Sequence, residues 1–152
     1  ENNKYGMGTS VERASASTDL HRRGAAYDIP GRIVDGMDVT EVYQAGQEAV
    51  AHVRGGNGPM ILEMKTYRYR GHSMSDPAKY RSKEELARMR TEHDPIDRLR
   101  QKLIDQKVLT EQAIKVIDKA IKDEVTAAAE FAQQSPEPDP AELYTDVLLN
   151  VA

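Results

Sequence analysis

The stretch MILEMKTYRYRGHSMSDP, residues 60–77, decides which fold the sequence predicts. Its first five residues, Met60–Met64, are apolar except for one glutamate and follow a proline, which is typical of a short buried strand. The part Tyr69–Pro77 places a histidine, two serines, a carboxylate and an arginine on a loop bounded by glycine and proline. Ligands of open α/β sheets bind at the carboxyl ends of the strands, so this loop predicts a site that includes His72. An alternative stays open, in which His72 only caps a surface loop made of turn-forming residues.

A strand and a helix are predicted before this stretch. The turn signal Ile29–Gly31 precedes a short strand at Arg32–Val34. Asp38 then forms a capping box with Glu41, because its carboxylate can accept the Glu41 backbone N–H and begin a helix. Strand, helix and strand in this order predict a βαβ unit with a mostly parallel sheet, so the fold class is α/β. The helical face expected to pack on the sheet consists of Val42, Ala45, Gly46, Ala49, Val50 and Val53.

Helices are predicted after the loop. Glu84–Arg90 is a short helical stretch, Asp94 before a proline caps a second helix, and Thr110 caps a third. The second and third helices are joined by a short connection and predict an antiparallel helical hairpin. Their apolar stripes are Ile96, Leu99, Leu103 and Ile104 in one helix and Ile114, Ile117, Ile121, Val125 and Ala128 in the other.

The chain therefore divides into two predicted regions. Residues 1–81 form an α/β part that ends in the loop 67–81, and residues 82–152 form a helical part. A stiff proline-rich linker at 135–140 leads into an apolar tail that we expect to dock on this chain or on a partner. The apolar residues of the tail are Tyr144, Val147, Leu148, Leu149 and Val151.

Composition excludes some classes of protein. A net charge of −4 with 30% charged residues argues against nucleic-acid binding, and no apolar run is long enough to span a membrane. The chain has no cysteine, which excludes disulfides and thiolate metal sites. We therefore expect protein and small-molecule partners. Residues 1–28 read as irregular, with one short helical turn around Leu20.

The opening residues, Glu1–Gly8, contain an asparagine pair before a glycine. Asparagine commonly tolerates unusual backbone angles in such turns, which is one interpretation. Amide and backbone carbonyl oxygens are also ligands that Mg²⁺ takes alongside carboxylate and phosphate, which is the other. Because a second polar segment follows the predicted sheet, a binding site that uses both segments is the interpretation we favour.

Three segments together carry a resemblance to a known family. Glu1–Arg13, Val34–Asp38 and Thr66–Arg81 resemble the C-terminal half of the alpha subunits of thiamine-diphosphate-dependent 2-oxoacid dehydrogenases, most closely the bacterial members of the pyruvate type. The resemblance extends over essentially all of the chain. In this family a cofactor fingerprint begins with Gly-Asp-Gly and closes on an asparagine pair. Only the closing end is present here, so we expect the Gly-Asp-Gly half upstream of Glu1, in a longer polypeptide.

The resemblance implies roles for individual residues. Asn3 would bind Mg²⁺ through its side chain and Tyr5 through its backbone carbonyl, with Asn2 beside the metal but not bound to it. His72 corresponds to the catalytic histidine of the active-site loop, close to the diphosphate of the cofactor. Ser73 corresponds to the serine that regulatory kinases phosphorylate in the mitochondrial members.

One departure from the family pattern bears on regulation. Mitochondrial members carry a further serine in the segment that is Asp76–Arg81 here, and this chain has none. The difference argues against kinase control and favours a bacterial, cytoplasmic member, with the mitochondrial matrix as the alternative location. We further expect Arg68, Arg70 and Arg81 to pin the loop through Asp76, unless they are simply solvated.

The activity implied by the resemblance is the oxidative decarboxylation of pyruvate with reductive acetylation of a lipoyl group, which links glycolysis to acetyl-CoA. The implied cofactors are thiamine diphosphate and Mg²⁺. The implied partners are a beta subunit, in a heterotetramer of two alpha and two beta subunits, and the lipoyl domain of the dihydrolipoyl acetyltransferase. Two alternatives stay open: an acetoin or branched-chain 2-oxoacid dehydrogenase alpha subunit, and a non-catalytic module that uses its helices to hold a partner.

Overall fold

The computed structural model describes residues 1–145. By internal packing the chain forms two compact units, Glu1–Gln106 and a second one that begins at Lys107. The first unit is a mixed α/β structure and contains all of the predicted site residues. The predicted division into a cofactor-binding part, residues 1–81, and a helical part, residues 82–152, concerns function and not packing. It stays a prediction.

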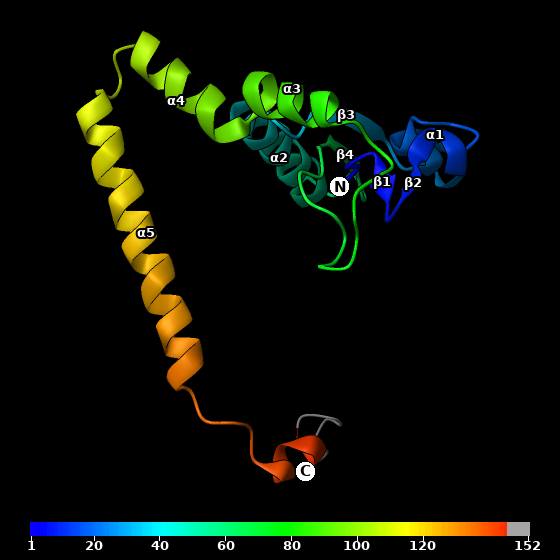
Figure 1. Cartoon of the computed structure of the whole chain (residues 1–152). Coiled ribbons are helices and arrows are strands. Elements are labelled where there is room, and N and C mark those ends of the chain that lie inside the picture. The colour runs from blue at the N-terminus through cyan, green and yellow to red at the C-terminus, as the bar shows by residue number, and fades with distance from the viewer. Residues whose placement is uncertain (146–152) are drawn as a thin grey trace. The chain divides into compact units, whose positions relative to one another are not determined.

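A parallel pair of strands lies at the centre of the first unit (Figure 1). β3 (Gly31–Asp35) and β4 (Ile61–Lys65) pair in a register that runs from Gly31 opposite Ile61 to Asp35 opposite Lys65. Helix α2 (Val39–Arg54) connects them. The predicted strand, helix and strand are thus confirmed, and the parallel pairing brings both carboxyl ends to the same edge of the sheet.

Helix α2 is buried around Ala45 and exposed along its last turns. Val34 of β3 and Ala45 of α2 are completely buried. Val50 and Val53, which we expected on the buried face, are 48% and 52% exposed in this chain. The capping prediction is confirmed for Asp38, which accepts from the backbone N–H groups of Thr40 and Glu41. The Glu41 carboxylate, however, accepts from the Asp35 backbone N–H at 3.0 Å and so ties the helix start to β3.

The N-terminal segment has more regular structure than its sequence indicated. β1 (Tyr5–Gly6) pairs antiparallel with β2 (Thr9–Ser10), and the short helix α1 (Val11–Ala14) follows. The turn predicted around Leu20 is confirmed and is longer, because a 3₁₀ helix, η1, spans Leu20–Tyr27. Strands of two residues are too short to leave an alternation pattern in the sequence, which is why they were missed.

Two further helices complete the first unit. α3 (Lys83–His93) begins after Ser82, whose hydroxyl accepts from the Glu85 backbone N–H. α4 (Pro95–Asp105) begins after Asp94, whose carboxylate accepts from the N–H groups of Ile96 and Asp97. The cap Asp94 is confirmed as predicted, whereas the cap Ser82 was not predicted, because only the helical stretch Glu84–Arg90 was expected there.

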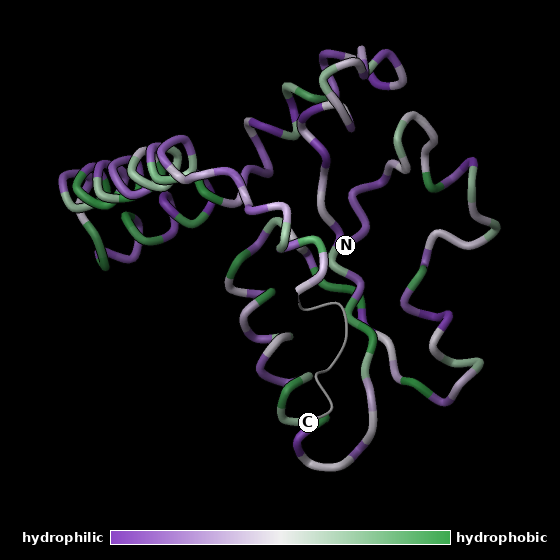
Figure 2. Tube along the Cα trace, turned by 90° about the horizontal axis from the view of Figure 1, so that it is seen from below, coloured by the Kyte–Doolittle hydropathy of each residue, from purple (hydrophilic) through white to green (hydrophobic). Residues whose placement is uncertain are grey.

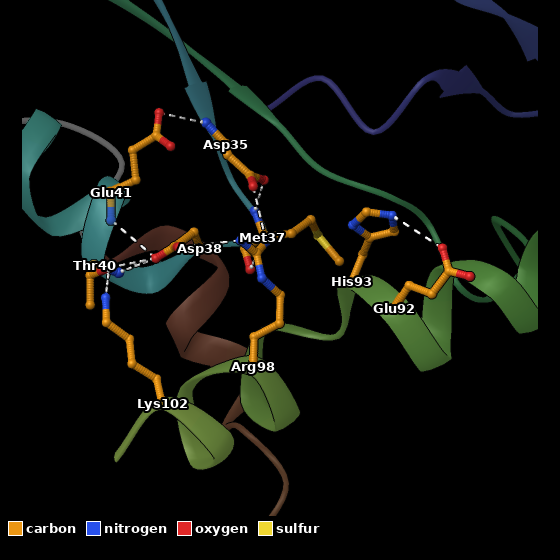
Figure 3. A network of polar contacts seen from close by, with 9 residues as sticks. All are labelled: Asp35, Met37, Asp38, Thr40, Glu41, Glu92, His93, Arg98 and Lys102. Carbon is orange, nitrogen blue, oxygen red and sulfur yellow. Dashed lines mark hydrogen bonds and ion pairs between the residues drawn. The ribbon is translucent and has the colours of Figure 1, made fainter. Parts of the chain in front are cut away.

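Arg98 attaches α4 to the carboxyl end of β3 (Figure 3). Its guanidinium donates to the Asp35 carboxylate at 2.9 Å, to the Met37 carbonyl at 3.1 Å and to the Asp38 carboxylate at 3.2 Å. Lys102, one turn later, donates to the Thr40 hydroxyl at 3.0 Å. One helix face thus contacts both the strand end and the cap of α2.

The second unit contains helix α5 (Glu111–Gln134), which begins at the predicted cap Thr110. Each turn of this helix carries both hydrophobic and hydrophilic residues (Figure 2). A short 3₁₀ helix, η2 (Pro140–Tyr144), follows the proline-rich linker, whose residues 135–139 form neither helix nor strand. The exposed large apolar side chains of α5 are Val116, Ile117, Ile121, Val125 and Phe131.

Three expectations for this half of the chain have different outcomes. Val147, Leu148, Leu149 and Val151 of the apolar tail lie outside the described residues. The antiparallel packing of α4 and α5 stays a prediction. Among residues 1–145, no helix combines the length and the apolar character that crossing a lipid bilayer would require.

Candidate functional site

The opening segment lies beside the carboxyl end of β4. The Asn2 backbone N–H donates to the Met64 carbonyl at 2.8 Å, and the Thr66 N–H donates to the Asn2 carbonyl at 2.9 Å. These two bonds make an isolated parallel bridge between Asn2 and Lys65. The asparagine pair and the start of the loop 67–81 are therefore neighbours at the edge of the sheet where ligands of α/β proteins bind.

A buried polar network fixes Asn2 in this position. Its side-chain amide donates to Glu63 Oε1 at 2.6 Å. Both residues are buried, with Asn2 6% exposed and Glu63 5% exposed. The same carboxylate accepts from Lys65 Nζ at 2.7 Å and from the His21 backbone N–H at 2.8 Å. Burial alone would raise the pKa of Glu63, but the hydrogen bonds from Lys65, Asn2 and His21 outweigh it and lower the pKa to about 2. Glu63 is therefore a charged anchor behind the asparagine pair.

The residues predicted to bind Mg²⁺ share one tight turn. Asn3 Oδ1 accepts from the Tyr5 backbone N–H at 3.1 Å, and Lys4 between them has a positive φ of 71°. Asn3 and Tyr5 both line a cavity of about 300 Å³. An amide oxygen has two lone pairs, so Asn3 Oδ1 retains capacity for a cation beside its bond to Tyr5.

The donor set for a metal is nevertheless partial. Among the described residues, no group of three or more histidines and carboxylates is placed to hold a metal ion. Two neutral oxygens agree with the chemistry of a Mg²⁺ site that is completed by phosphate oxygens and a carboxylate from elsewhere. The turn can therefore contribute ligands to a Mg²⁺ site, but it does not form a complete site.

Asp76 organises the loop 67–81. Its carboxylate accepts from the backbone N–H groups of His72 and Ala78, each at 2.8 Å, and from the Tyr80 hydroxyl at 3.0 Å. The hydrogen bonds from His72 and Ala78 lower the pKa of Asp76 below its usual range. Gly71 allows this packing, because a Cβ there would lie 2.8 Å from the Asp76 carbonyl oxygen. Within residues 1–145, the hydrogen bonds of the Asp76 carboxylate come from backbone groups and a tyrosine and not from Arg68, Arg70 or Arg81. The positive charge of Arg81 adds to the lowering of the Asp76 pKa, so the predicted role of the arginines is limited to this effect.

His72 is exposed on this loop, and its ring has a defined partner. Arg68 Nη1 lies 2.9 Å from His72 Nδ1. A guanidinium has only donors, so Nδ1 accepts and the hydrogen of the neutral ring is on Nε2. The ring can therefore donate from Nε2 to a ligand oxygen. Ser73, next to it, is exposed and its hydroxyl lies 3.0 Å from that of Ser75.

A cluster of tyrosines around Arg81 joins the opening turn to the loop. The Arg81 guanidinium lies 6.0 Å from the Tyr5 ring centroid, 5.4 Å from that of Tyr67 and 5.7 Å from that of Tyr80. The hydroxyls of Tyr5 and Tyr67 both donate to Glu85 Oε1, at 3.3 Å and 2.8 Å. Burial and then the bond to Glu85 raise the pKa of Tyr67 to about 12. We call these five residues the Arg81 cage.

The structure thus brings together part of the predicted site. Tyr5 of the Asn3–Tyr5 turn contacts residues from both ends of the loop 67–81. Within residues 1–145, the side-chain and backbone hydrogen bonds of His72 go to Arg68 and Asp76, and none joins it to Asn3 or Tyr5. The two ends of the loop are therefore fixed to the Asn3–Tyr5 turn, and the His72 segment is held by bonds within the loop.

Comparison with known proteins decides the family. The family described as "Dehydrogenase E1 component" matches residues 1–141. The chain belongs to the dehydrogenase E1 component family. This result confirms the resemblance that the sequence segments carried.

Several curated proteins are similar over nearly the whole chain. Pyruvate dehydrogenase E1 component subunit alpha of Rhizobium meliloti is 62% identical over 149 residues, which are 98% of this chain and 43% of that protein. The protein of the same name from Zymomonas mobilis is 53% identical over 98% of this chain and 42% of its own length. The mitochondrial protein of this name from Dictyostelium discoideum is 49% identical over 98% of this chain and 39% of its own length. The chain thus spans about two fifths of the length of these relatives.

Three residues that matter in this E1 chain were missed by sequence reasoning: Glu63, Arg98, and Glu85 in the Arg81 cage. Glu63 stood out only as the one charge in an apolar strand, which is a usable signal, because a buried carboxylate requires partners. Arg98 and Glu85 lie on helices among many other charges and left no such signal.

Proposed function

We propose that the chain is the C-terminal part of the alpha subunit of a pyruvate dehydrogenase E1 component. The proposed reaction is the oxidative decarboxylation of pyruvate, with reductive acetylation of a lipoyl group. The names of the relatives support the substrate, and the contact of Tyr5 with both ends of the loop 67–81 supports a shared site. This contact is the observation that carries the proposal, because it joins the Asn3–Tyr5 turn to the loop with His72.

Asn3 Oδ1 and the Tyr5 carbonyl would hold Mg²⁺, which would supply positive charge for the diphosphate of thiamine diphosphate. Thiamine diphosphate, when bound, supplies the nucleophilic carbon and the electron sink for the reaction. The protein's contribution at this turn is two neutral oxygens, which bind the cation without adding repulsion toward the diphosphate. The Glu63 network holds the turn at the strand end from behind.

His72 would bind or move a proton in the reaction. With Nδ1 accepting from Arg68, its Nε2 hydrogen can be donated to a phosphate or to a substrate carboxylate. Arg68 beside it adds positive charge where both ligands are anionic. Ser73 is the candidate position for regulation, since a phosphate there would add negative charge next to His72.

The partners of such a subunit follow from the proposed reaction. A beta subunit would complete the heterotetramer, and the lipoyl domain of the dihydrolipoyl acetyltransferase would accept the acetyl group. We propose the bacterial cytoplasm as the location, with the mitochondrial matrix as the alternative. An acetoin or branched-chain 2-oxoacid substrate remains the second enzymatic proposal. The exposed apolar face of α5 favours an added interaction role for the second unit.

The test of this proposal is His72→Ala in the complete enzyme. We expect turnover of pyruvate to fall by about 10²-fold or more, the scale of a lost acid, base or positioning group, while thiamine diphosphate affinity changes by less than about tenfold. The matched control is His93→Ala, because His93 is exposed on α3 and its recorded partner is Glu92. Steady-state rates near wild type for His72→Ala at saturating cofactor would refute the proposed role.

A further inference from the structure

The Arg81 cage contains a guanidinium with unusual surroundings. Arg81 Nη2 donates to the Tyr69 carbonyl at 2.8 Å. Its other two nitrogens, Nε and Nη1, are buried and have no hydrogen-bond partner within the described chain. Three tyrosine rings lie within 6.0 Å of the guanidinium carbon. The faces of aromatic rings attract a cation, so the rings take the place of hydrogen-bond acceptors.

The rings come from distant parts of the sequence. Tyr5 belongs to the opening turn, and Tyr67 and Tyr80 flank the loop on either side. The Tyr5 ring also packs directly on the other two, with centroids 6.4 Å from Tyr67 and 5.1 Å from Tyr80. Glu85 accepts from two of the hydroxyls, which fixes the tilt of those rings and balances the charge of Arg81. Within the Arg81 cage, Tyr5 is therefore the residue through which the opening turn contacts the two ends of the loop, Tyr67 and Tyr80.

We propose that Arg81 is a positioning residue that holds the Asn3–Tyr5 turn against the base of the loop 67–81 through the three tyrosine rings. The inference rests on the proposed function, because it assigns the turn its task of presenting Asn3 Oδ1 and the Tyr5 carbonyl to a metal. A lysine cannot replace Arg81 in this role. Its compact, strongly hydrated ammonium lacks the planar surface that stacks on several rings and also donates to Tyr69.

The test uses Arg81→Lys in the complete heterotetramer, with the probe Mn²⁺ in place of Mg²⁺. Free Mn²⁺ is measured by electron paramagnetic resonance in the presence of thiamine diphosphate, so turnover is not needed. We expect Mn²⁺ affinity to fall about tenfold, which corresponds to about 1.4 kcal/mol. In the cofactor-free protein, amide hydrogen exchange at residues 2–6 should rise about fivefold or more, while exchange in β3 and β4 stays unchanged.

The matched control is Arg90→Lys. Arg90 also lies over a tyrosine of the loop, 5.4 Å from the Tyr69 ring, but it contacts one ring and not Tyr5. We expect this variant to keep Mn²⁺ affinity within twofold. A second variant, Tyr5→Leu, removes the ring but keeps the backbone carbonyl. If Arg81 acts through this ring, the second substitution should add nothing to the first. The double variant Arg81→Lys/Tyr5→Leu should then bind Mn²⁺ as tightly as the single variant with the lower Mn²⁺ affinity.

The outcomes separate the inference from the proposed function. If wild-type enzyme binds Mn²⁺ and Arg81→Lys binds it equally well with unchanged exchange at residues 2–6, the inference is refuted and the proposed function stands. Additive effects in the double variant would also refute it. If wild-type enzyme with thiamine diphosphate binds no Mn²⁺, the metal assignment of the turn fails, and the inference fails with it.

Discussion

The side-chain amide of Asn2 donates a 2.6 Å hydrogen bond to the carboxylate of Glu63, 61 residues later in the chain. This bond joins the residue before Asn3 to the middle of β4. Because the carboxylate also accepts from Lys65 and from the His21 backbone, it holds three segments together at one buried point. The position of the Asn3–Tyr5 turn at the strand end therefore depends on a charged residue that is not among the residues lining the cavity beside the turn.

Acid should weaken this anchor. The pKa of Glu63 is about 2 in the folded chain and 4.5 ordinarily. Since the folded value is the lower one, the charged carboxylate favours folding above pH 4.5, and this contribution is lost as the pH falls from 4.5 toward 2. The shift corresponds to about 3 kcal/mol, at roughly 1.36 kcal/mol per pKa unit. Calorimetry on wild type and Glu63→Gln should show a gap in melting temperature that is large at pH 7 and less than half as large at pH 3. Glu84→Gln, on the exposed start of α3, should show almost no gap; a Glu63 gap that is independent of pH would contradict the account.

Removing Arg98 should loosen α4. Arg98→Ala deletes the contacts to Asp35, Met37 and Asp38, but the side chain is 35% exposed, so solvent screens much of the ionic energy. We expect a loss of about 1 kcal/mol, seen as roughly fivefold faster amide exchange in α4. Gln101→Ala is the control, because its hydrogen bond to Asp105 lies on the exposed surface of the same helix and should matter less. Equal exchange in the two variants would show that Arg98 does not hold the helix.

Gly71→Ala should disturb the loop with His72. The new Cβ would lie 2.8 Å from the Asp76 carbonyl oxygen and 2.9 Å from its Cβ and Cγ, so Asp76 would have to move. Its bonds to the His72 and Ala78 N–H groups would then weaken, and trypsin should cut the loop at Arg70 and Lys79 several times faster, because cleavage tracks local opening. Gly46→Ala in α2 is the control, since a Cβ there meets nothing within 4 Å. A cleavage rate equal to wild type for Gly71→Ala would mean that the loop tolerates the shift.

Charge at Ser73 should depress activity. Ser73→Glu places a carboxylate beside His72, where the proposed diphosphate and substrate are both anionic. Ser73→Ala should be nearly silent, because it removes only an exposed contact to the Ser75 hydroxyl. The measurement is turnover of pyruvate by the complete enzyme. If the glutamate variant has a normal rate, Ser73 does not face the site.

Local signals predicted much of the fold. The strands β3 and β4 and the starts of α2, α4 and α5 follow from apolar runs and from the caps Asp38, Asp94 and Thr110, each of which acts within a few residues of its own position. The parallel pairing followed because strand, helix and strand in sequence leave few other topologies. The Glu41 side chain, in contrast, bonds Asp35 and not the helix cap, a choice that depends on the tertiary neighbour.

The site itself was less predictable. Asn3, Tyr5 and His72 were assigned by resemblance, and their roles stay predictions. The groups that position them are long-range: Glu63 acts on Asn2 across 61 positions, and Arg81 gathers rings from the opening segment and from the loop 67–81. Such contacts depend on how distant segments fold together, and no spacing pattern in a single sequence predicts them.

The most direct measurement is a calorimetric titration of thiamine diphosphate, in the presence of Mg²⁺, into the complete enzyme that carries Asn3→Ala. An octahedral Mg²⁺ site has few protein ligands, so we expect the loss of Asn3 Oδ1 to weaken binding of thiamine diphosphate by about tenfold or more. Tyr5→Phe is the matched control in the same turn, because it keeps both the proposed carbonyl ligand and the ring in the Arg81 cage. It loses only the 3.3 Å bond from the Tyr5 hydroxyl to Glu85, so binding of thiamine diphosphate should weaken far less than in Asn3→Ala. Unchanged affinity for Asn3→Ala would contradict the assignment of this turn to the metal.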